Sequence, residues 1–301
     1  YNRHVLELSH DQKKTLLSLN EWFYSVQSKS GKNYITVGGY AGTGKTTLLA
    51  YLRHLLYKQN SGVKVAFVSY TGKATQVLKS KLNMHKQLQK GDFIGTIHSL
   101  IYDTIEDDRG VVLGWEIKEK QNVVYDLLIV DEASMVDEKI WNDLLYFDIP
   151  VIAVGDHGQL PPINGNFNLM AKPQLTLEKI HRQAENNPII KVSILAREDG
   201  EIPYDIFGEK VAKYRFNESG YLVDEALESY NKETLFLCGY NSSRVKINSA
   251  IRKNLGFELP TPLPGDRVIC LRNNHKKQIF NGMLGDLVRL ENGGDESYIA
   301  E

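Results

Sequence analysis

The sequence has little of the material that several classes of protein need. It contains two cysteines, Cys238 and Cys270, among 301 residues, and they match no metal or redox spacing. We therefore expect two reduced thiols, not a disulfide scaffold or a zinc site. No apolar run approaches the roughly 18 residues that a membrane-spanning helix needs, and no signal peptide opens the chain. We therefore expect no membrane partner.

A surplus of charge of one sign is also lacking. The 36 Lys and Arg residues balance 37 Asp and Glu residues, for a net charge of −1. A nucleic acid, if bound, would have to be met by a local basic strip. The hydrophobic fraction of 42% and the charged fraction of 24% are those of a globular protein, and the length allows two domains with full cores.

The stretch from Tyr34 to Ala50, YITVGGYAGTGKTTLLA, predicts a strand, a glycine-rich turn and a helix. Its centre fits G-x-x-x-x-G-K-[ST] at every fixed position, which is a phosphate loop in its required context. Backbone N–H groups wrap the phosphate, Lys45 contacts the β- and γ-phosphates, and Thr46 ligates Mg²⁺. We therefore expect a nucleoside triphosphate to contact Gly39, Gly42, Thr43, Gly44, Lys45, Thr46 and Thr47.

Gln12 has two interpretations. Ser9 and Gln12 have the spacing of a capping box at the start of a helix. Alternatively, Gln12 reads the adenine edge, as a glutamine does at this place in many helicases. The sequence does not separate the two.

A second set of candidate residues follows an apolar strand over Asp126–Val130. Asp131 and Glu132 come directly after it. In nucleotide hydrolases the first carboxylate of such a pair holds Mg²⁺, and the second polarises the attacking water. A further strand over Val151–Val154 precedes Gln159, which is a candidate sensor of the γ-phosphate.

Other polar residues follow two more predicted strands. Thr71 and Lys73 come at the carboxyl end of a strand over Lys64–Tyr70, where open α/β sheets bind ligands. His98 lies in a polar cluster, GTIHSL, and a lone histidine there is more often structural than catalytic. Residues 101–125 predict a projecting β-hairpin.

The second half of the chain shows fewer signals. A helix is predicted over Pro188–Arg197, and a strand over Thr234–Cys238 precedes a helix that runs to Leu255. A further strand begins near Pro264. Arg182, taken alone, is typical of a surface arginine.

Taken together, these segments resemble a superfamily 1 helicase of the RecD-like group, which includes the phage Dda-type enzymes. The matching motifs, in the order of the family, are GGYAGTGKT, SYTGKAT, GTIHSL, VDEASM, GDHGQLPP, IHRQ, GYNSSRVKIN and GDRVICLRN…FNGMLGD. The resemblance implies an α/β fold of two RecA-like domains with parallel sheets, over residues 1–180 and 181–301. The hairpin at about 101–125 is an insertion in the first domain, and the second domain is incomplete.

The resemblance also implies roles for individual residues, with ATP and Mg²⁺ as cofactors. Arg182 reaches the γ-phosphate and joins Lys45, Glu132 and Gln159 as a catalytic residue. Residues 103–118 match the strand-separating pin, and translocation runs 5′ to 3′. The positions that match single-stranded DNA contacts are Thr71, Lys73, Thr96, His98, Ser99, Asn241, Arg244 and Asn248.

One departure concerns the end of the chain. The last two motifs of the family do not follow Asp286, and the chain starts at Tyr1 and not at Met. We expect a piece of a longer protein, which binds ATP and DNA, hydrolyses slowly and fails to unwind when it ends at Glu301. The expected partners are single-stranded DNA, duplex/single-strand junctions and replication or recombination proteins, in the cytoplasm of a bacterium or a phage-infected host. A nucleic-acid-binding switch toggled by ATP, or an RNA helicase of the same superfamily, are the alternatives.

Overall fold

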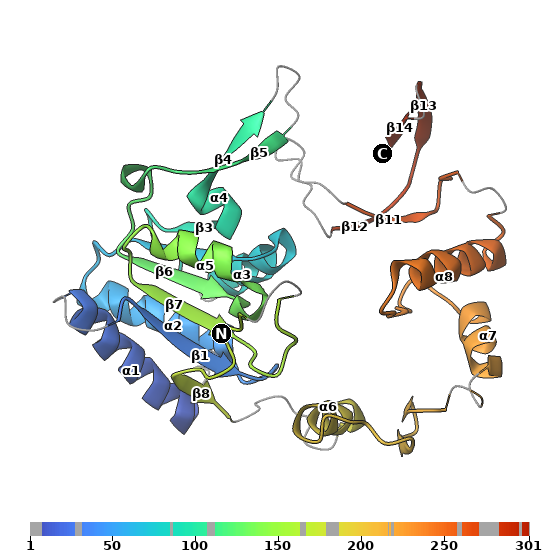
Figure 1. Ribbon diagram of the computed structural model, residues 1–301, viewed down its shortest axis with the longest axis horizontal. Coiled ribbons are helices and arrows are strands. Elements are labelled where there is room, and N and C mark those ends of the chain that lie inside the picture. The colour runs from blue at the N-terminus through green and yellow to red at the C-terminus, as the bar shows by residue number, and fades with distance from the viewer. Residues whose placement is uncertain are drawn as a thin grey trace, which may run out of the picture. The chain divides into compact units, whose positions relative to one another are not determined.

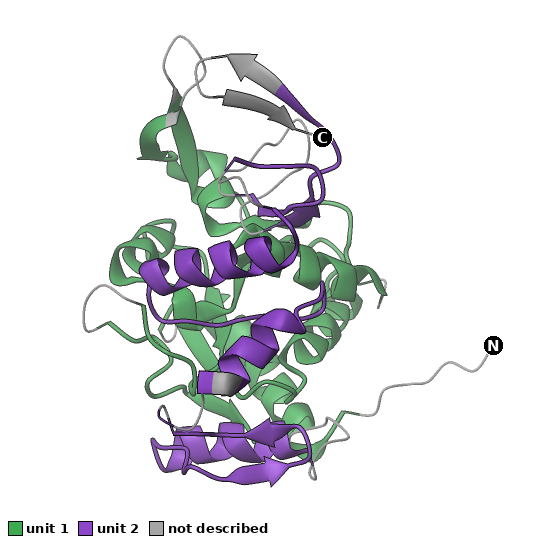
Figure 2. Cartoon of the chain, turned by 90° about the vertical axis from the view of Figure 1, so that its right-hand side faces the viewer, with its two compact units in different colours: residues 1–183, 271–282 green, residues 184–270, 283–301 purple. Residues whose placement is uncertain are grey.

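The computed structural model describes residues 8–27, 32–84, 87–106, 112–162, 167–178, 187–215, 217, 220–257, 261–270, 283–294 and 297–300. The chain divides into two compact units. The first comprises Tyr1–Gln183 with Leu271–Gly282, and the second comprises Ala184–Cys270 with Met283–Glu301. Figure 2 shows the described residues of the first unit in green and those of the second in purple. We describe each unit by itself.

The first unit is built on a six-stranded sheet in which every neighbouring pair of strands is parallel. The strand order is β3-β2-β6-β7-β1-β8. The predicted α/β class with a parallel sheet is therefore confirmed for this unit. The bounds are β1 Tyr34–Gly39, β2 Val65–Ser69, β3 Phe93–Thr96, β6 Leu127–Asp131, β7 Val151–Gly155 and β8 Leu175–Leu177.

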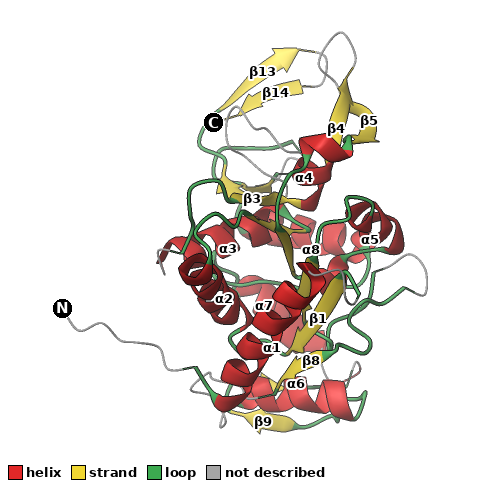
Figure 3. Ribbon diagram, turned by 90° about the vertical axis from the view of Figure 1, so that its left-hand side faces the viewer, coloured by secondary structure: helices red, strands yellow, loops and turns green. Residues whose placement is uncertain are grey.

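Helices cover both faces of this sheet, as Figures 1 and 3 show. Strands β2, β6 and β7 are buried along their whole length, which explains their continuous apolar runs. One core cluster joins the sheet to helices α1, α2 and α3, and a second joins it to α4 and α5. The bounds are α1 His10–Gln27, α2 Lys45–Gln59, α3 Gly72–Met84, α4 Ile97–Ile101 and α5 Glu138–Leu145.

A buried ion pair fixes helix α2 against the amino-terminal edge of the sheet. The Arg53 guanidinium donates to Asp92 over 2.8 Å, and both side chains are almost fully buried, at 0% and 2% exposure. Asp92 also accepts hydrogen bonds from the backbone N–H groups of Val65 and Gln89. Because removal of one partner would leave a buried charge unpaired, this pair is a structural element of the fold.

The predicted hairpin is confirmed. Strands β4, Tyr102–Glu106, and β5, Val112–Ile117, pair antiparallel and follow directly from helix α4. Short 3₁₀ helices lie at Lys120–Asn122 and Ala133–Met135.

The second unit contains helices and short antiparallel strand pairs within its described residues. The helices are α6 Pro188–Glu198, α7 Gly220–Glu228 and α8 Asn241–Asn254, and the pairs are β9 Ile206–Gly208 with β10 Val211–Ala212, β11 Arg267–Ile269 with β12 Leu284–Asp286, and β13 Leu290–Gly294 with β14 Ser297–Ala300. None of the helices that the structure describes is long and apolar enough to cross a membrane.

The strand predicted over Thr234–Cys238 is wrong. These residues form no strand, and Leu235 and Leu237 are 77% and 86% exposed. A strand needs a hydrogen-bonded neighbour, and within the described residues this segment pairs with none. Its β-prone composition therefore does not decide its structure.

Candidate nucleotide and nucleic-acid site

The candidate residues of the first unit follow the carboxyl ends of parallel strands, which all meet at one edge of the sheet. The phosphate loop follows β1, Asp131 ends β6, and Gln159 comes after β7, and these three strands are neighbours in the order β6-β7-β1. Strand β2 precedes Thr71, and strand β3 ends at Thr96. The carboxyl ends of these two strands continue the same edge of the sheet. Ligands of open α/β sheets bind at such an edge.

The phosphate loop has the backbone geometry that its glycines permit. Gly42 and Gly44 have φ of 90° and 81°, in the left-handed region that side chains disfavour. A Cβ at Gly39 would lie 2.6 Å from the Thr43 hydroxyl oxygen, so the loop also needs glycine there. Thr46 and Thr47 lie half-buried in the first turn of α2, whose N-terminus carries partial positive charge.

Lys45 folds back onto this loop. Its Nζ donates to the carbonyl oxygens of Gly39 at 2.5 Å and Tyr40 at 3.1 Å. Burial lowers the pKa of Lys45, while the nearby carboxylates of Asp156, Glu132 and Asp131 act to raise it. The ammonium therefore lies where a cation faces both the loop and the acidic residues after β6 and β7.

Asp156 is a site residue that the sequence analysis missed. It is 5% exposed, and its carboxylate accepts from the backbone N–H of Gly158 over 2.9 Å. It is the strongest carboxylate influence on Lys45. The signal in the sequence is its position directly after an apolar strand, which it shares with Asp131.

Asp131 and Glu132 lie in different environments. Burial, and then the neighbouring Glu132 carboxylate, raise the pKa of Asp131 to about 6. Glu132 has φ of 55°, a conformation that is uncommon for residues other than glycine and concentrates at functional sites. A divalent cation would favour the ionised form of Asp131, so a buried carboxylate and the Thr46 hydroxyl fit the oxygen ligands that Mg²⁺ prefers.

Two contacts connect the loop after β7 to its neighbours. Gln159 Oε1 accepts a hydrogen bond of 3.0 Å from the hydroxyl of Ser134, which lies beside the acidic pair. The His157 ring lies 4.3 Å from the Tyr40 ring, between centroids. No sequence pattern points to Ser134, His157 or Tyr40 as site residues, because their contacts join segments that are distant in sequence.

Gln12 makes both local and distant hydrogen bonds. Its Oε1 accepts from the Ser9 N–H over 2.9 Å, and its own N–H donates to the Ser9 hydroxyl over 3.3 Å. This reciprocal pair confirms the capping box. Gln12 Nε2 also donates to the Thr43 carbonyl over 2.9 Å, so the cap of α1 holds the phosphate loop. The contact with adenine stays a prediction.

The candidate DNA contacts of the first unit also have local roles. Thr71 Oγ1 accepts from the Ala74 N–H at the start of α3, and Lys73 is exposed in the first turn of that helix. Thr96 Oγ1 accepts from the Ser99 N–H and caps α4. These hydroxyl groups therefore position the helix starts, which present backbone and side-chain donors at the sheet edge.

His98 lies in an aromatic cluster. Its ring centroid is 5.4 Å from that of Tyr102, 5.6 Å from that of Trp115 and 6.2 Å from that of Tyr70. Burial lowers the pKa of His98, so the ring is neutral at pH 7. It therefore offers an aromatic face and not a charge.

The candidate residues of the second unit share one face of α8. Asn241, Arg244 and Asn248 are spaced at i, i+3 and i+7 and are all exposed. Arg182 lies outside the described residues.

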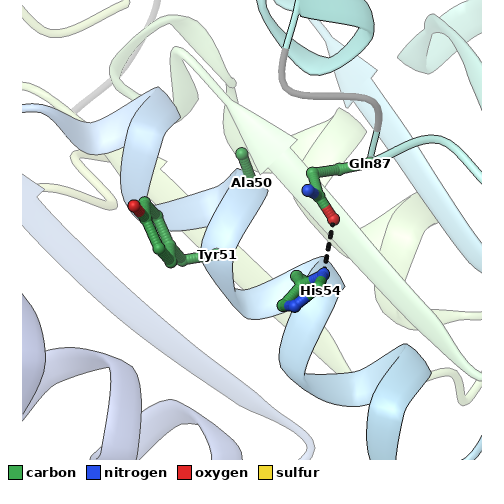
Figure 4. Close-up of a pocket in the computed structure, with 4 residues that line it drawn as sticks. All are labelled: Ala50, Tyr51, His54 and Gln87. Atoms are coloured by element: carbon green, nitrogen blue, oxygen red, sulfur yellow. Dashed lines mark hydrogen bonds between the residues drawn. The ribbon is translucent and has the colours of Figure 1, made fainter. Parts of the chain in front are cut away.

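A shallow cavity lies on the side of α2, away from the phosphate loop. It is lined by Ala50, Tyr51, His54 and Gln87, and Figure 4 shows His54 and Gln87 turned toward each other. His54 Nδ1 and Gln87 Oε1 are 3.2 Å apart. The candidate chemistry of the sheet edge does not involve this cavity.

The family model described as "AAA domain" matches residues 25–218, which is more than half of the chain. The "ATP-dependent RecD2 DNA helicase" of Deinococcus radiodurans is 27% identical, over 93% of this chain and 39% of that protein. The "ATP-dependent DNA helicase dda" of Enterobacteria phage T4 is 29% identical, over 75% of this chain and 54% of that protein. The crystal structure of Pif1 helicase from Candida albicans is 19% identical, covers 97% of this chain and 71% of that one, and has a TM-score of 0.45. The chain thus spans about half, or less, of the two curated relatives.

Proposed function

This chain belongs to the AAA domain family and to the RecD-like and Dda-like group of superfamily 1 helicases, which confirms the resemblance of its motifs, and from that premise we propose a function. We propose that it is the motor portion of an ATP-dependent DNA helicase. In this proposal it translocates on single-stranded DNA, 5′ to 3′, and separates duplex strands at junctions. The two curated relatives are named as ATP-dependent DNA helicases, which supports this class of activity.

The observation that carries the proposal is the arrangement along one sheet edge. The candidate nucleotide-binding segments lie at the ends of three neighbouring β-strands: the phosphate loop, Asp131 and the loop of Gln159. The candidate DNA contacts of the first unit lie at the ends of the next two β-strands, β2 and β3. Nucleotide and nucleic acid therefore meet the same rigid sheet. A conformational change in the nucleotide-binding loops can therefore be transmitted to the DNA-contacting segments through adjacent strands of the sheet.

The residues of this edge have distinct roles in the proposed reaction. Lys45 leaves the carbonyls of its own loop and binds the β- and γ-phosphate oxygens. Glu132 accepts a proton from the attacking water, and Gln159, held by Ser134, orients that water against the γ-phosphate. Thr46 and Asp131 would hold Mg²⁺, which would neutralise charge on the phosphate oxygens. Arg182 contributes a further positive charge.

The experiment that tests the function is strand displacement. Duplexes with a 5′ or a 3′ single-stranded tail are compared, with ATP and with a non-hydrolysable analogue. Because the chain spans only part of its relatives, the full-length protein that contains this sequence, here called the parent, is tested beside the 301-residue form. We expect the parent to displace the strand of the 5′-tailed duplex, and only with ATP.

Three outcomes would contradict parts of this proposal. ATP-dependent binding without displacement by the parent would indicate a nucleic-acid-binding switch. Stimulation of ATP hydrolysis by RNA oligomers and not by DNA oligomers would indicate an RNA helicase. Displacement of the 3′-tailed duplex alone would reverse the direction.

A further inference from the structure

The hairpin β4–β5 carries an exposed indole on one of its faces. Residues directly opposite each other in an antiparallel pair point to the same face, so Thr104 with Trp115, and Tyr102 with Ile117, define one face. Neither pair carries a charge. The Trp115 side chain is 49% exposed, whereas Trp141 is only 4% exposed. An indole held open to solvent costs free energy, so it is a candidate contact surface.

The root of this hairpin is tied to the candidate strand contacts. The Lys118 N–H donates to the Ile101 carbonyl over 2.9 Å, and Lys118 Nζ donates to the Ser99 carbonyl over 3.0 Å. The Trp115 ring lies 5.6 Å from the His98 ring, at 65° to it. Trp115 is therefore held at a defined position beside the GTIHSL loop.

The charges around this aromatic cluster suit a polyanion. Asp143 is compensated, since it accepts hydrogen bonds from the Tyr102 hydroxyl and from Lys139 Nζ. Asp103 lies 3.8 Å from Lys118 Nζ. Lys73 is exposed in the first turn of α3, three residues after Tyr70, whose ring centroid lies 6.2 Å from that of His98. The chain thus combines ammonium groups with an exposed aromatic ring, the indole of Trp115, which is the combination by which proteins hold single strands.

We propose that Trp115 is a base-stacking residue for single-stranded DNA, and that the edge-to-face contact with His98 holds its indole in place. The inference rests on the proposed function, because it states how the same strand is gripped. An unpaired base stacks on the indole while Lys73 and Lys118 attract the neighbouring phosphates. Since every base has an aromatic face, this contact is tolerant of sequence, as a translocating motor requires.

The test compares two strands of equal length, oligothymidylate and an abasic strand that keeps the backbone but has no bases. We expect Trp115→Ala to weaken oligothymidylate binding by about 5- to 150-fold, the range for loss of one base–aromatic stack. Trp115→Phe should restore most of the affinity. Trp115→Ala should bind the abasic strand as weakly as the unchanged chain does. Leu113→Ala is the matched control, since Leu113 is also on β5 and is 69% exposed, and it should bind both strands normally.

Two further measurements distinguish base stacking from a merely structural role of Trp115. They are the salt dependence of DNA affinity and the quenching of indole fluorescence by DNA. Because stacking releases no counterions, Trp115→Ala should leave the slope of log affinity against log salt unchanged. Oligothymidylate should quench the fluorescence of the unchanged chain, and Trp115→Phe should lose most of that quenching. Normal oligothymidylate binding by Trp115→Ala, or equal weakening on both strands, would overturn the inference alone. Failure of the unchanged chain to bind any single strand would overturn the proposed function as well.

Discussion

Asp131 binds a proton more tightly in the folded chain than in the unfolded chain. Its pKa rises from 3.8 to about 6 on folding, because of burial and then Glu132. The stability that it contributes is therefore full below about pH 4 and is lost as the pH rises through about 6. Without nucleotide, the folded chain thus carries a destabilised carboxylate at neutral pH, a cost in stability that is common at functional sites.

The first prediction follows from that titration. Asp131→Asn, which stays neutral, should raise the thermal unfolding midpoint relative to the unchanged chain at about pH 8 and not at about pH 4. Unfolding is measured without nucleotide or Mg²⁺. Glu21→Gln, at an exposed position on α1, is the control. An equal effect of Asp131→Asn at both pH values would contradict the assignment.

Substitution of Glu132 should affect ATP hydrolysis without affecting ATP binding. Glu132→Gln removes the proposed base and leaves Thr46 and Asp131 as oxygen ligands. We expect ATP binding to persist while single-turnover hydrolysis falls by ~10²–10⁴, the usual cost of losing a general base. The control is Glu138→Gln, on an exposed carboxylate in the first turn of α5. Parallel loss of ATP binding would mean that Glu132 is structural or a metal ligand.

At the scale of elements, the phosphate loop and the loop after β7 touch through two rings. His157 Nδ1 is buried and has no hydrogen-bond partner among the described residues, so packing on Tyr40 holds this ring. His157→Ala should release the loop that carries Gln159. We expect turnover to fall by about 2- to 10-fold, the worth of an aromatic pair of ~0.5–1.5 kcal/mol, with little change in ATP affinity.

His157→Phe distinguishes packing from hydrogen bonding at this position. It keeps an aromatic ring beside Tyr40 and removes both nitrogens, so turnover should stay near that of the unchanged chain. Steady-state hydrolysis and equilibrium binding of a nucleotide analogue are measured for both variants. If His157→Phe is as impaired as His157→Ala, the ring contact does not carry the effect.

The elements that the sequence predicted are those whose own residues specify them. The buried strands β1, β2, β6 and β7 have continuous apolar runs, and α2 follows a complete phosphate-loop motif. Strand β8 was missed because three residues, Leu175–Leu177, carry too short a pattern. The strand predicted over Thr234–Cys238 was wrong because pairing, and not composition, decides whether a strand forms.

The same limit applies to the candidate site. Lys45, Asp131 and Glu132 were found because their motifs are local and each follows a strand. Asp156 escaped notice because its influence on Lys45 arises only when β6, β7 and β1 lie side by side. The contact of Trp115 with His98 also depends on the way the hairpin folds back on α4.

At the scale of the whole molecule, near-neutral charge requires that DNA binding be local. Lys73 of the first unit and Arg244 of the second are two of the proposed phosphate contacts. Each phosphate contact with a single strand adds about 0.7 to the slope of log affinity against log salt. We therefore expect Lys73→Ala/Arg244→Ala to weaken binding to oligothymidylate and to reduce that slope by about 1.4.

A charge-matched control separates the loss of these two phosphate contacts from the general effect of removing two positive charges. Lys58 lies in the last turn of α2 and Lys90 precedes β3, so both lie toward the amino-terminal edge of the sheet. Lys58→Ala/Lys90→Ala should keep affinity and slope. If the slope of log affinity against log salt were the same for both double variants, the proposed placement of the single-stranded DNA would be contradicted.

In the proposed function, one sheet edge couples ATP hydrolysis to single-stranded DNA. The most direct test of this coupling is the rate of ATP hydrolysis by the 301-residue chain, measured with and without saturating oligothymidylate. We predict that the strand raises turnover, that Lys45→Ala abolishes hydrolysis with and without DNA while the fold stays intact, and that Lys58→Ala behaves as the unchanged chain. Turnover that ignores the strand, or that persists in a well-folded Lys45→Ala variant, would contradict the claim.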